Sequence, residues 1–424
     1  MAELIQPVKG MNDVLADQAP WWDRLEAVAH ELFASYGYRR VRLPVLERTE
    51  LFSRSIGELT DIVSKEMFTF DDHGDSLTLR PEGTAGLVRA ALCNGLLHNQ
   101  QQKLWLSGPM FRREKPQKGR YRQFHQMSVE ALGFPDAEID AELIALSARL
   151  WRELGLKSTK LELNTIGTAE SRQKYKQVLV EHFSRHRELL DDDSLRRLDR
   201  NPLRILDSKN PQLRELIDAA PLLSDYLDAE SRAHFERVRA LLGDVGVGYV
   251  LNPRLVRGLD YYSRTVFEWV TDRLGAQSAI CSGGRYDGLV AQLGGHDTPA
   301  VGWALGLERI VELMQAEGIG ADEAPLDAQL VAVGEAERRF GFKLVEQLRE
   351  RLPGVRVSVG TPSAGFKAQL RHADKNGARF ALILGESELA AGKVSVKPLR
   401  EDRPQQLMTV EECAELLRQT RAPA

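Results

Sequence analysis

The chain has 424 residues, of which 43% are hydrophobic and 28% are charged, and its formal net charge is −4. This composition indicates a globular protein of two or three domains and excludes a uniformly basic coat protein for nucleic acid. No apolar run has the length of a membrane span, no signal-peptide pattern opens the chain, and the three cysteines are too scattered for a disulfide framework. We therefore expect a cytosolic (cytoplasmic) protein with no membrane partner.

The first predicted elements are an amphipathic helix and a strand interrupted by proline. Apolar residues recur at helical spacing over 21–36, and Gly37 is a natural stop. The strand is expected over 38–47. Because Pro44 cannot donate to a sheet ladder, this strand should lie at a sheet edge or between two chains.

A second strand, at 76–79, leads through the turn Arg80-Pro81-Glu82-Gly83-Thr84 into a helix expected over 85–97. A carboxylate and a hydroxyl at such a turn can hold the ammonium group of a substrate. The same residues also make an ordinary helix start, and for this segment alone that simpler explanation is favoured.

The segment 104–133 is predicted to form two strands joined by a strongly basic loop. Between Arg112 and Arg122, six lysines and arginines stand against one glutamate, a net +5 that suggests a phosphate-binding loop. In the second strand, the face that carries Gln126 and Glu130 is polar and is predicted to line a cavity. The opposite face is mostly apolar and is predicted to pack against helices. A solvated edge hairpin is the alternative.

The rest of the chain divides into an insertion, a return to strands, and a final domain. Charged helical segments broken by Asn-Pro pairs indicate a helical insertion at about 169–240. Strand-like sequence resumes at Gly248, and a linker rich in Gly, Asp, Glu and Pro covers 316–327. Beyond it, strands and helices alternate in an order typical of a compact α/β domain.

Two further segments carry candidate site residues. Arg257-Gly-Leu-Asp-Tyr-Tyr262 offers a guanidinium suited to carboxylate or phosphate and two tyrosines for a pocket wall. In Gly302-Trp-Ala-Leu-Gly-Leu-Glu-Arg309, small residues on one strand face would let a flat ligand approach the backbone, and Arg309 begins a helix within reach of a phosphate. The glycines of Ser282-Gly-Gly-Arg-Tyr-Asp-Gly288 are expected to form a flexible turn. Close packing is the structural alternative for the small residues.

Together these segments resemble the class II aminoacyl-tRNA synthetases, and specifically the histidyl-tRNA synthetase family, over essentially the whole chain. The specific signatures are Arg257-Gly-Leu-Asp-Tyr-Tyr262 and Gly283-Gly-Arg-Tyr-Asp-Gly288, both intact. Helix 21–36 with the Pro44 strand resembles the family's first motif, a dimer interface. The basic hairpin resembles the second motif, and the stretch that ends at Arg309 resembles the third.

The resemblance also implies a fold and a domain organisation. Residues 1–325 would form an α+β catalytic domain, built on a mostly antiparallel sheet flanked by helices, with the helical insertion at about 169–240. Residues 328–424 would form an anticodon-binding α/β domain of mixed sheet. The implied assembly is a homodimer, joined through the N-terminal helix and the Pro44 strand.

The resemblance implies a histidine pocket in which three residues take the α-ammonium group and three others surround the imidazole. The ammonium ligands would be Glu82, Thr84 and Gln126. Glu130 and Tyr262 would bind the imidazole, whose two ring nitrogens differ in donor and acceptor character, and Tyr261 would belong to the same wall.

The resemblance assigns the chemistry to arginines. Arg112 and Arg257 would be catalytic, holding the carboxylate and the α-phosphate during attack, and Arg309 would hold the γ-phosphate of ATP. Arg112 would thus bind ATP as well. The implied reaction joins L-histidine to ATP, with Mg²⁺, to give histidyl-adenylate and pyrophosphate, and then transfers the histidyl group to the 3′ end of tRNA(His).

No metal-ligand set is predicted from the protein itself. His182 and His186 have i, i+4 spacing, but no neighbouring Cys or carboxylate pattern completes a zinc site, so we interpret them as part of a solvated helix face.

The main alternative function is a non-catalytic, histidine-binding regulatory subunit of ATP phosphoribosyltransferase. Such paralogues resemble the catalytic core, but typically lack the C-terminal domain and lose parts of the signature loops. Here residues 328–424 and the signature arginines are all present, which favours the ligase. A non-catalytic RNA-binding protein on the same fold is the third possibility, and it would leave those arginines as costly buried charges without a ligand.

Overall fold

The computed structural model describes residues 4–57, 60, 62–117, 119–198, 201–206, 208, 210–259, 261–275, 278–320, 326–360 and 364–420. Two compact units divide the chain, Met1–Ala321 and Asp322–Ala424, and each is considered by itself. Of the expected linker, residues 321–325 lie outside the described part. Among the described residues, no helix combines the length and the apolar composition needed to cross a bilayer.

The first unit is organised around an eight-stranded sheet with the order β1-β5-β6-β11-β10-β9-β7-β8. In that order the strands are Arg39–Arg40, Gln102–Phe111, Gln123–Leu132, Ala300–Gly306, Ala279–Arg285, Ser263–Val270, Lys160–Thr165 and Val250–Leu251.

This sheet is mixed, so the expectation of a mostly antiparallel catalytic sheet is corrected. The inner strands pair antiparallel, but β1 pairs parallel with β5 at one edge and β8 pairs parallel with β7 at the other. Both edge strands are two residues long. So short a strand carries no periodic signal, and its direction is set by the connection that delivers it.

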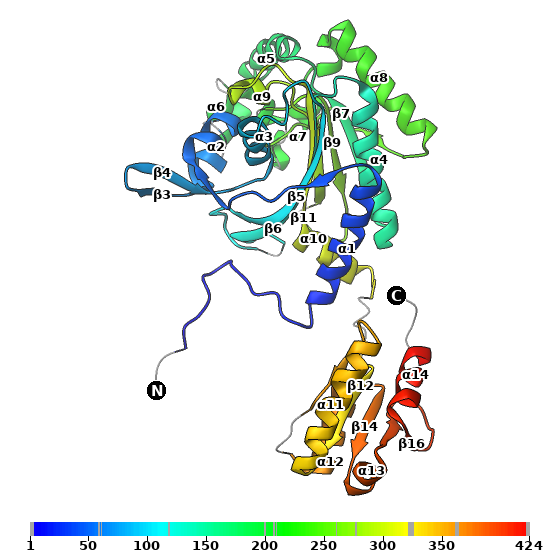
Figure 1. The fold of residues 1–424 in the computed structure, drawn as a ribbon. Coiled ribbons are helices and arrows are strands. Elements are labelled where there is room, and N and C mark those ends of the chain that lie inside the picture. Colours follow the sequence, from blue (N-terminus) through cyan, green and yellow to red (C-terminus); the bar gives the residue numbers. More distant parts are fainter. Residues whose placement is uncertain are drawn as a thin grey trace. The chain divides into compact units, whose positions relative to one another are not determined.

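Strand alternation separates two cores on the two faces of the sheet. On β6, Met127, Val129 and Ala131 join the core formed with α1 (Ala19–Ser35), α4 (Ala137–Leu154), α8 (Ala229–Asp244) and α10 (Leu307–Ala316). Figure 1 shows α1, α4 and α8 together on one side of the sheet. This confirms that the apolar face of the second hairpin strand packs against helices.

The other face of the sheet is covered by shorter elements. They include α3 (Thr84–Cys93), α5 (Ala169–Ser184), α6 (Asp192–Leu198), α7 (Arg214–Asp218) and α9 (Leu289–Gln292), seen opposite α4 in Figure 1. Short 3₁₀ turns connect the helices of the insertion, at Arg187–Leu189, Pro202–Ile205, Pro211–Leu213 and Leu223–Tyr226. A small sheet, β2-β4-β3 (Leu46–Arg48, Asp75–Leu79 and Phe68–Asp72), lies with α2 (Thr49–Ile56) and a π-helical turn at Ile62–Glu66.

Two expectations for this unit were wrong in detail. The strand expected over 38–47 is two short strands in different sheets, β1 and β2, and Pro44 lies exposed between them. Its ring prevents a continuous ladder. The glycine turn expected at Ser282–Gly288 is instead largely strand, because β10 runs through to Arg285.

The second unit is a five-stranded mixed sheet with the order β13-β12-β14-β15-β16, and the expected alternation of elements is confirmed. Helices α11 and α14 contribute to the core on one face, and Leu370 of α12 packs on the other. Strand β16 and helix α13 were not predicted. In chain order the elements are β12 (Ala328–Ala332), α11 (Glu335–Arg351), β13 (Val357–Ser358), α12 (Phe366–Lys375), β14 (Phe380–Leu384), α13 (Glu386–Ala391), β15 (Val394–Pro398), β16 (Gln406–Met408) and α14 (Val410–Thr420).

Close packing explains why a strand in the middle of the large sheet contains glycine. A β-carbon added at Gly283 would lie 2.4 Å from the carbonyl oxygen of Gly302 and 2.5 Å from the β-carbon of Trp303. Neither atom can move without shifting the backbone of the neighbouring strand.

We therefore predict that Gly283→Ala destabilises the first unit, by about 1–3 kcal/mol or more, because it overpacks a rigid contact. Thermal unfolding followed by circular dichroism measures the effect. Gly288→Ala is the matched control, since a β-carbon there meets nothing within 4 Å and its φ of −82° suits any residue. Equal melting temperatures for the two variants would contradict the packing argument.

Candidate active site

A cavity of about 260 Å³ opens on the face of the large sheet opposite α1 and α4. Its walls come from β6, β10 and β11, from the start of α3 and from residues 257, 259, 261 and 262. All nine residues predicted from the sequence line this one cavity. They are Glu82, Thr84, Arg112, Gln126, Glu130, Arg257, Tyr261, Tyr262 and Arg309.

A buried carboxyl group forms the floor of the cavity. Glu130, 1% exposed, accepts a hydrogen bond from the Thr84 hydroxyl at 2.6 Å and another from the Tyr286 hydroxyl at 2.5 Å. Burial raises the pKa of Glu130 to about 8, against the lowering effect of these two bonds. The group is therefore mostly protonated at neutral pH.

The Glu130 carboxyl group fits on the cavity floor because the residue opposite it on the neighbouring strand is a glycine and has no side chain. Glu130 on β6 pairs directly with Gly302 on β11. A β-carbon at Gly302 would lie 1.6 Å from Glu130 Oε2, so any side chain at that position would displace the carboxyl group. The small residues of β11 are thus explained both by close packing and by the shape of the cavity that they line.

Glu82 combines a structural contact with its place in the cavity. Its two oxygens accept the backbone N–H groups of Thr84, at 2.7 Å, and Ala85, at 2.9 Å, at the start of α3. Burial raises the pKa of Glu82, and these two bonds oppose the rise. The helix-start interpretation of this segment is therefore correct, and it coexists with a carboxyl group that faces the cavity.

Three arginines from separate parts of the chain converge on the cavity. Arg112 donates to the carbonyl of Pro81 at 2.9 Å, and Arg309 donates to that of Ala279 at 2.7 Å. Arg257 pairs with Glu268 at 2.6 Å. These bonds orient the three groups, and a guanidinium suits a ligand of negative charge because its planar set of donors matches the oxygens of a carboxylate or phosphate.

Three polar atoms in the cavity wall are buried without a hydrogen bond among the described residues, namely Glu114 Oε2, Gln126 Oε1 and Arg257 Nε. Glu114 Oε2 lies 3.0 Å from Arg120 Nη1 in an ion pair, whereas no such pair is found for Gln126 Oε1 or Arg257 Nε in the described part of the chain. An unpaired buried acceptor and an unpaired buried donor are unfavourable without a ligand. Their presence fits a cavity that binds a substrate with both donor and acceptor groups.

Tyrosines form the remaining wall. The rings of Tyr261 and Tyr262 lie 4.7 Å apart, and the ring of Tyr286 lies 5.5 Å from that of Tyr261. Burial raises the pKa of all three hydroxyl groups, so they remain neutral donors. Arg257 stacks over Tyr262 with its guanidinium carbon 5.5 Å from the ring centre.

Three residues that form or support this site were not predicted from the sequence. Tyr286 stands in a quoted signature, but it was assigned to a turn and so received no role. Glu268, which holds Arg257, and Ser282, which donates to the same Glu268 oxygen at 3.1 Å, lie on β9 and β10. Alternation along β10 is the signal that would have pointed Ser282 and Tyr286 toward one surface. Asp260 of the first signature lies outside the described residues.

His182 lies on α5 and His186 follows the end of this helix, and both take part in ordinary contacts. His182 Nε2 lies 3.1 Å from the carbonyl of Leu216, and the ring centre of His186 is 5.9 Å away. Across the described residues, no group of three or more His, Cys, Asp or Glu side chains is arranged to hold a metal ion.

The raised pKa of Glu130 predicts a pH-dependent contribution to stability. In the unfolded chain this carboxyl group ionises near its usual 4.5, whereas in the folded protein it stays protonated up to about 8. Between these values the unfolded state releases its proton first, so rising pH favours unfolding. Relative to the wild type, Glu130→Gln should therefore gain melting temperature as pH rises from about 5 to 8. A difference that is constant over this range would contradict the raised pKa.

Known families and proteins match nearly the whole chain. The family model described as histidyl-tRNA synthetase matches residues 10–310, and the model of an anticodon binding domain matches residues 327–420. A histidine–tRNA ligase of Halorhodospira halophila is 55% identical over 415 residues, 98% of each chain. That of Hydrogenovibrio crunogenus is 53% identical over 419 residues, 99% of this chain and 98% of the relative.

Solved structures agree with these matches. The apo histidyl-tRNA synthetase of S. aureus is similar with a TM-score of 0.82 and 35% identity, covering 98% of this chain and 100% of that one. A Bacillus halodurans protein described as an ATP phosphoribosyltransferase regulatory subunit/histidyl-tRNA synthetase has a TM-score of 0.66 and 22% identity, covering 91% and 100%. The latter likeness shows the fold alone. On the family model and the full-length relatives, the chain belongs to the histidyl-tRNA synthetase family.

Proposed function

We propose that this chain is an ATP-dependent histidine–tRNA ligase, which activates L-histidine as histidyl-adenylate and transfers the histidyl group to the 3′ end of tRNA(His). The observation that carries the proposal is the convergence of all nine predicted residues on one cavity. That cavity combines a buried carboxyl floor with three arginines, which suits an amino acid beside a polyphosphate.

Histidine would occupy the part of the cavity floored by Glu130. Glu82, Thr84 and Gln126 would take its ammonium group, and the unpaired oxygen of Gln126 supports this role. Glu130 and Tyr262 would bind the imidazole, with Tyr261 in the same wall. A pocket that pairs the side chain's polar groups would reject apolar analogues by roughly 10⁴–10⁵-fold.

The arginines would stabilise charge during adenylate formation. The histidine carboxylate attacks the α-phosphate, the bond from the α-phosphorus to the bridging oxygen breaks, and pyrophosphate leaves. Arg112 and Arg257 would hold the carboxylate and the α-phosphate, and Arg309 would hold the γ-phosphate. Rate enhancement would come from positioning and from fixed positive charge. A ribose hydroxyl at the tRNA 3′ end then takes the acyl group and releases AMP.

Mg²⁺ is proposed to enter with ATP and to neutralise charge on its phosphates. This ion usually keeps several waters and takes one or two carboxylates together with substrate phosphates. Glu114 and Glu308 line the cavity and offer oxygens of that kind. They would hold the ion jointly with the nucleotide.

The two units would divide the recognition of tRNA. We assign residues 1–325 to catalysis, with the helical insertion at about 169–240, and residues 328–424 to binding the anticodon. The basic hairpin loop, which supplies Arg112 and Arg120 to the cavity wall, would guide the acceptor end. Because the proposed reaction consumes ATP and tRNA, we also propose a cytosolic location.

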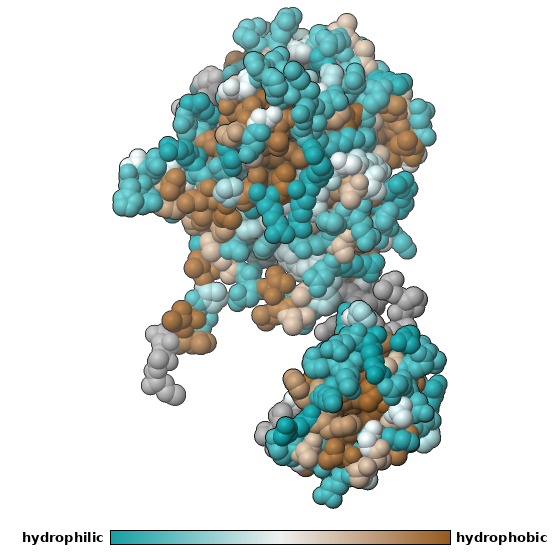
Figure 2. Space-filling view, viewed as in Figure 1, coloured by the Kyte–Doolittle hydropathy of each residue, from teal (hydrophilic) through white to brown (hydrophobic). Residues whose placement is uncertain are grey.

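A homodimer is proposed through the N-terminal helix and the Pro44 segment. Helix α1 buries Leu25, Ala29 and Phe33 in the core of the first unit, so an interface would use the opposite face of this helix. Apolar side chains are exposed along the segment that precedes α1, as Figure 2 shows at the N-terminal end of the chain. They are Leu4, Ile5, Val8, Val14 and Leu15. A partner that covers them would remove this surface from water.

Exchange of pyrophosphate into ATP, run with each of the twenty amino acids in turn, tests the proposed function. We expect exchange with histidine only, because adenylate formation is reversible and the pocket pairs imidazole. Histidine binding without exchange would contradict the ligase and would favour a regulatory subunit. Exchange that is faster with another amino acid than with histidine would contradict the assigned histidine pocket.

We further predict that Arg257→Ala lowers the rate of histidine-dependent exchange by roughly 10²–10³-fold, the effect of removing one donor from a developing negative charge. Arg185→Ala is the matched control. Its side chain is 69% exposed and, within the described part of the chain, forms an ion pair with Glu181 of α5. A loss similar in the two variants would show that Arg257 has no special part in the reaction.

A further inference from the structure

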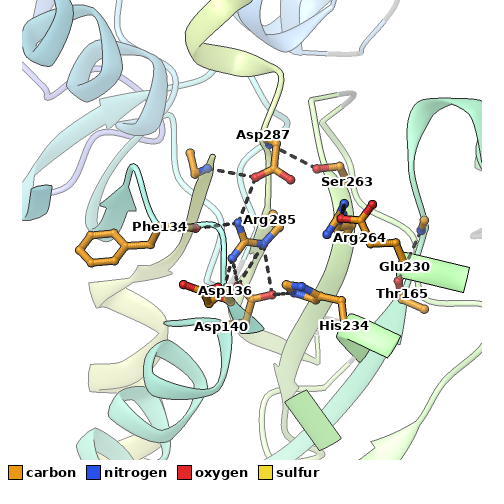
Figure 3. Close-up of polar contacts among 12 residues, drawn as sticks. Phe134, Asp136, Asp140, Thr165, Glu230, His234, Ser263, Arg264, Arg285 and Asp287 are labelled. Carbon is orange, nitrogen blue, oxygen red and sulfur yellow. Dashed lines mark hydrogen bonds and ion pairs between the residues drawn. The ribbon is translucent and has the colours of Figure 1, made fainter. Parts of the chain in front are cut away.

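A buried cluster of charges adjoins the histidine pocket from the opposite face of the sheet. Arg285, the last residue of β10, is 1% exposed, and each of its five N–H donors has an acceptor (Figure 3). Nε and Nη2 bond to Asp140, with Nη2 at 2.5 Å. The remaining donors reach the carbonyls of Phe134, at 2.9 Å, and Asp136, at 3.1 Å, and the carboxylate of Asp287, at 3.1 Å.

Asp140 is held from two sides. It lies on α4 with no exposed surface, and its Oδ2 lies 2.7 Å from Nε2 of His234 on α8. Burial raises the pKa of Asp140, but the hydrogen bond from His234 and the charge of Arg285 outweigh it and lower the pKa overall. The carboxylate is therefore ionised and depends on both partners.

Tyr286, the next residue in the chain, belongs to the histidine pocket. Its hydroxyl donates to Glu130 at 2.5 Å, and its backbone N–H donates to the carbonyl of Ala300 at 2.7 Å. Successive residues of an extended chain point to opposite faces. Arg285 therefore reaches toward α4 and α8, while Tyr286 reaches into the cavity.

The sheet ladder alone does not hold this part of the chain. Pairing between β10 and β9 shifts register between Gly284 and Arg285, and Gly284 has a φ of +156°. Hydrogen bonds from side chains hold the backbone where the strand pairing becomes irregular. Asp287 accepts from the backbone N–H of Ala300 at 3.1 Å, and its own N–H donates to the Ser263 hydroxyl at 3.3 Å.

We propose that Asp140 and His234, which do not line the cavity, are positioning residues for histidine recognition: by fixing Arg285 they set the place of Tyr286, and through it the orientation of the Glu130 carboxyl group. The inference rests on the proposed function, since it assigns histidine to this pocket. It also links α8, which begins within the helical insertion at about 169–240, to the floor of the site.

The effect should fall on histidine and not on ATP. We expect His234→Ala to weaken histidine affinity, measured by calorimetry, by roughly 2- to 30-fold, the range for residues that act through a packed network. The apparent KM for ATP in exchange should change by less than about twofold, because no ATP-binding arginine touches the cluster. His234→Gln, which keeps an N–H donor, should recover part of the affinity.

Arg237→Ala is the matched control. It removes an ion pair with Glu138, at 2.8 Å, that joins the same two helices, α8 and α4, at the exposed surface. If this variant lowers histidine affinity as much as His234→Ala, the effect is one of helix packing and the proposal is wrong. The proposal is also wrong if His234→Ala raises the apparent KM for ATP by the same factor by which it weakens histidine binding.

A double-mutant cycle with Tyr286→Phe tests the route. If His234 acts through Tyr286, the double variant binds histidine about as weakly as Tyr286→Phe alone. If the losses of histidine affinity in the two single variants add up in the double variant, His234 does not act through Tyr286. Calorimetry needs no turnover, so a wild type that binds histidine without exchange would refute the ligase function and still decide the positioning proposal. A wild type that does not bind histidine would overturn both.

Discussion

The site depends on one buried carboxyl group seated against a glycine. Glu130 occupies the space that any side chain at Gly302 would fill, and it is held by hydroxyl groups from two other segments, Thr84 and Tyr286. A buried carboxyl group without such partners would be costly. The requirement that it be paired ties the start of α3, the residue after β10 and the neighbouring strands β6 and β11 into one arrangement.

The same constraint explains the electrostatics of the cavity. Burial raises the pKa of Glu130 to about 8, so this carboxyl group does not cancel the positive charges of the arginines at neutral pH. Burial also raises the pKa of Glu82. Arg257 keeps its place through Glu268, outside the part of the wall that faces a ligand. The cavity thus combines hydrogen-bonding groups with positive charge, as an amino acid and a polyphosphate require.

Much of the site could be predicted from the sequence, because its residues stand in short strands and turns with a clear pattern. The alternation of β6 placed Gln126 and Glu130 on the polar face correctly. The role of Tyr286 was missed because three glycines near it suggested a turn, whereas Gly283 is required by contact with the backbone of β11. The partner of Arg285 could not be predicted either, since Asp140 lies 145 residues away in the chain.

The fold was predictable to a similar degree. Helices with a long amphipathic pattern, such as α1, were found within two residues of their observed ends. Strands of two residues, such as β1 and β8, carry no periodicity, so their parallel pairing and the mixed character of the sheet could not be foreseen. The six-residue helix α13 was missed for the same reason.

The most direct test of this account is a crystal structure of the protein bound to a non-hydrolysable analogue of histidyl-adenylate. The account predicts the imidazole against Glu130, with the hydrogen bond from Thr84 or Tyr286 exchanged for one to the ligand, and the phosphate between Arg112 and Arg257. An analogue bound with its imidazole away from Glu130, or with the carboxyl group still bonded to both hydroxyls, would contradict it.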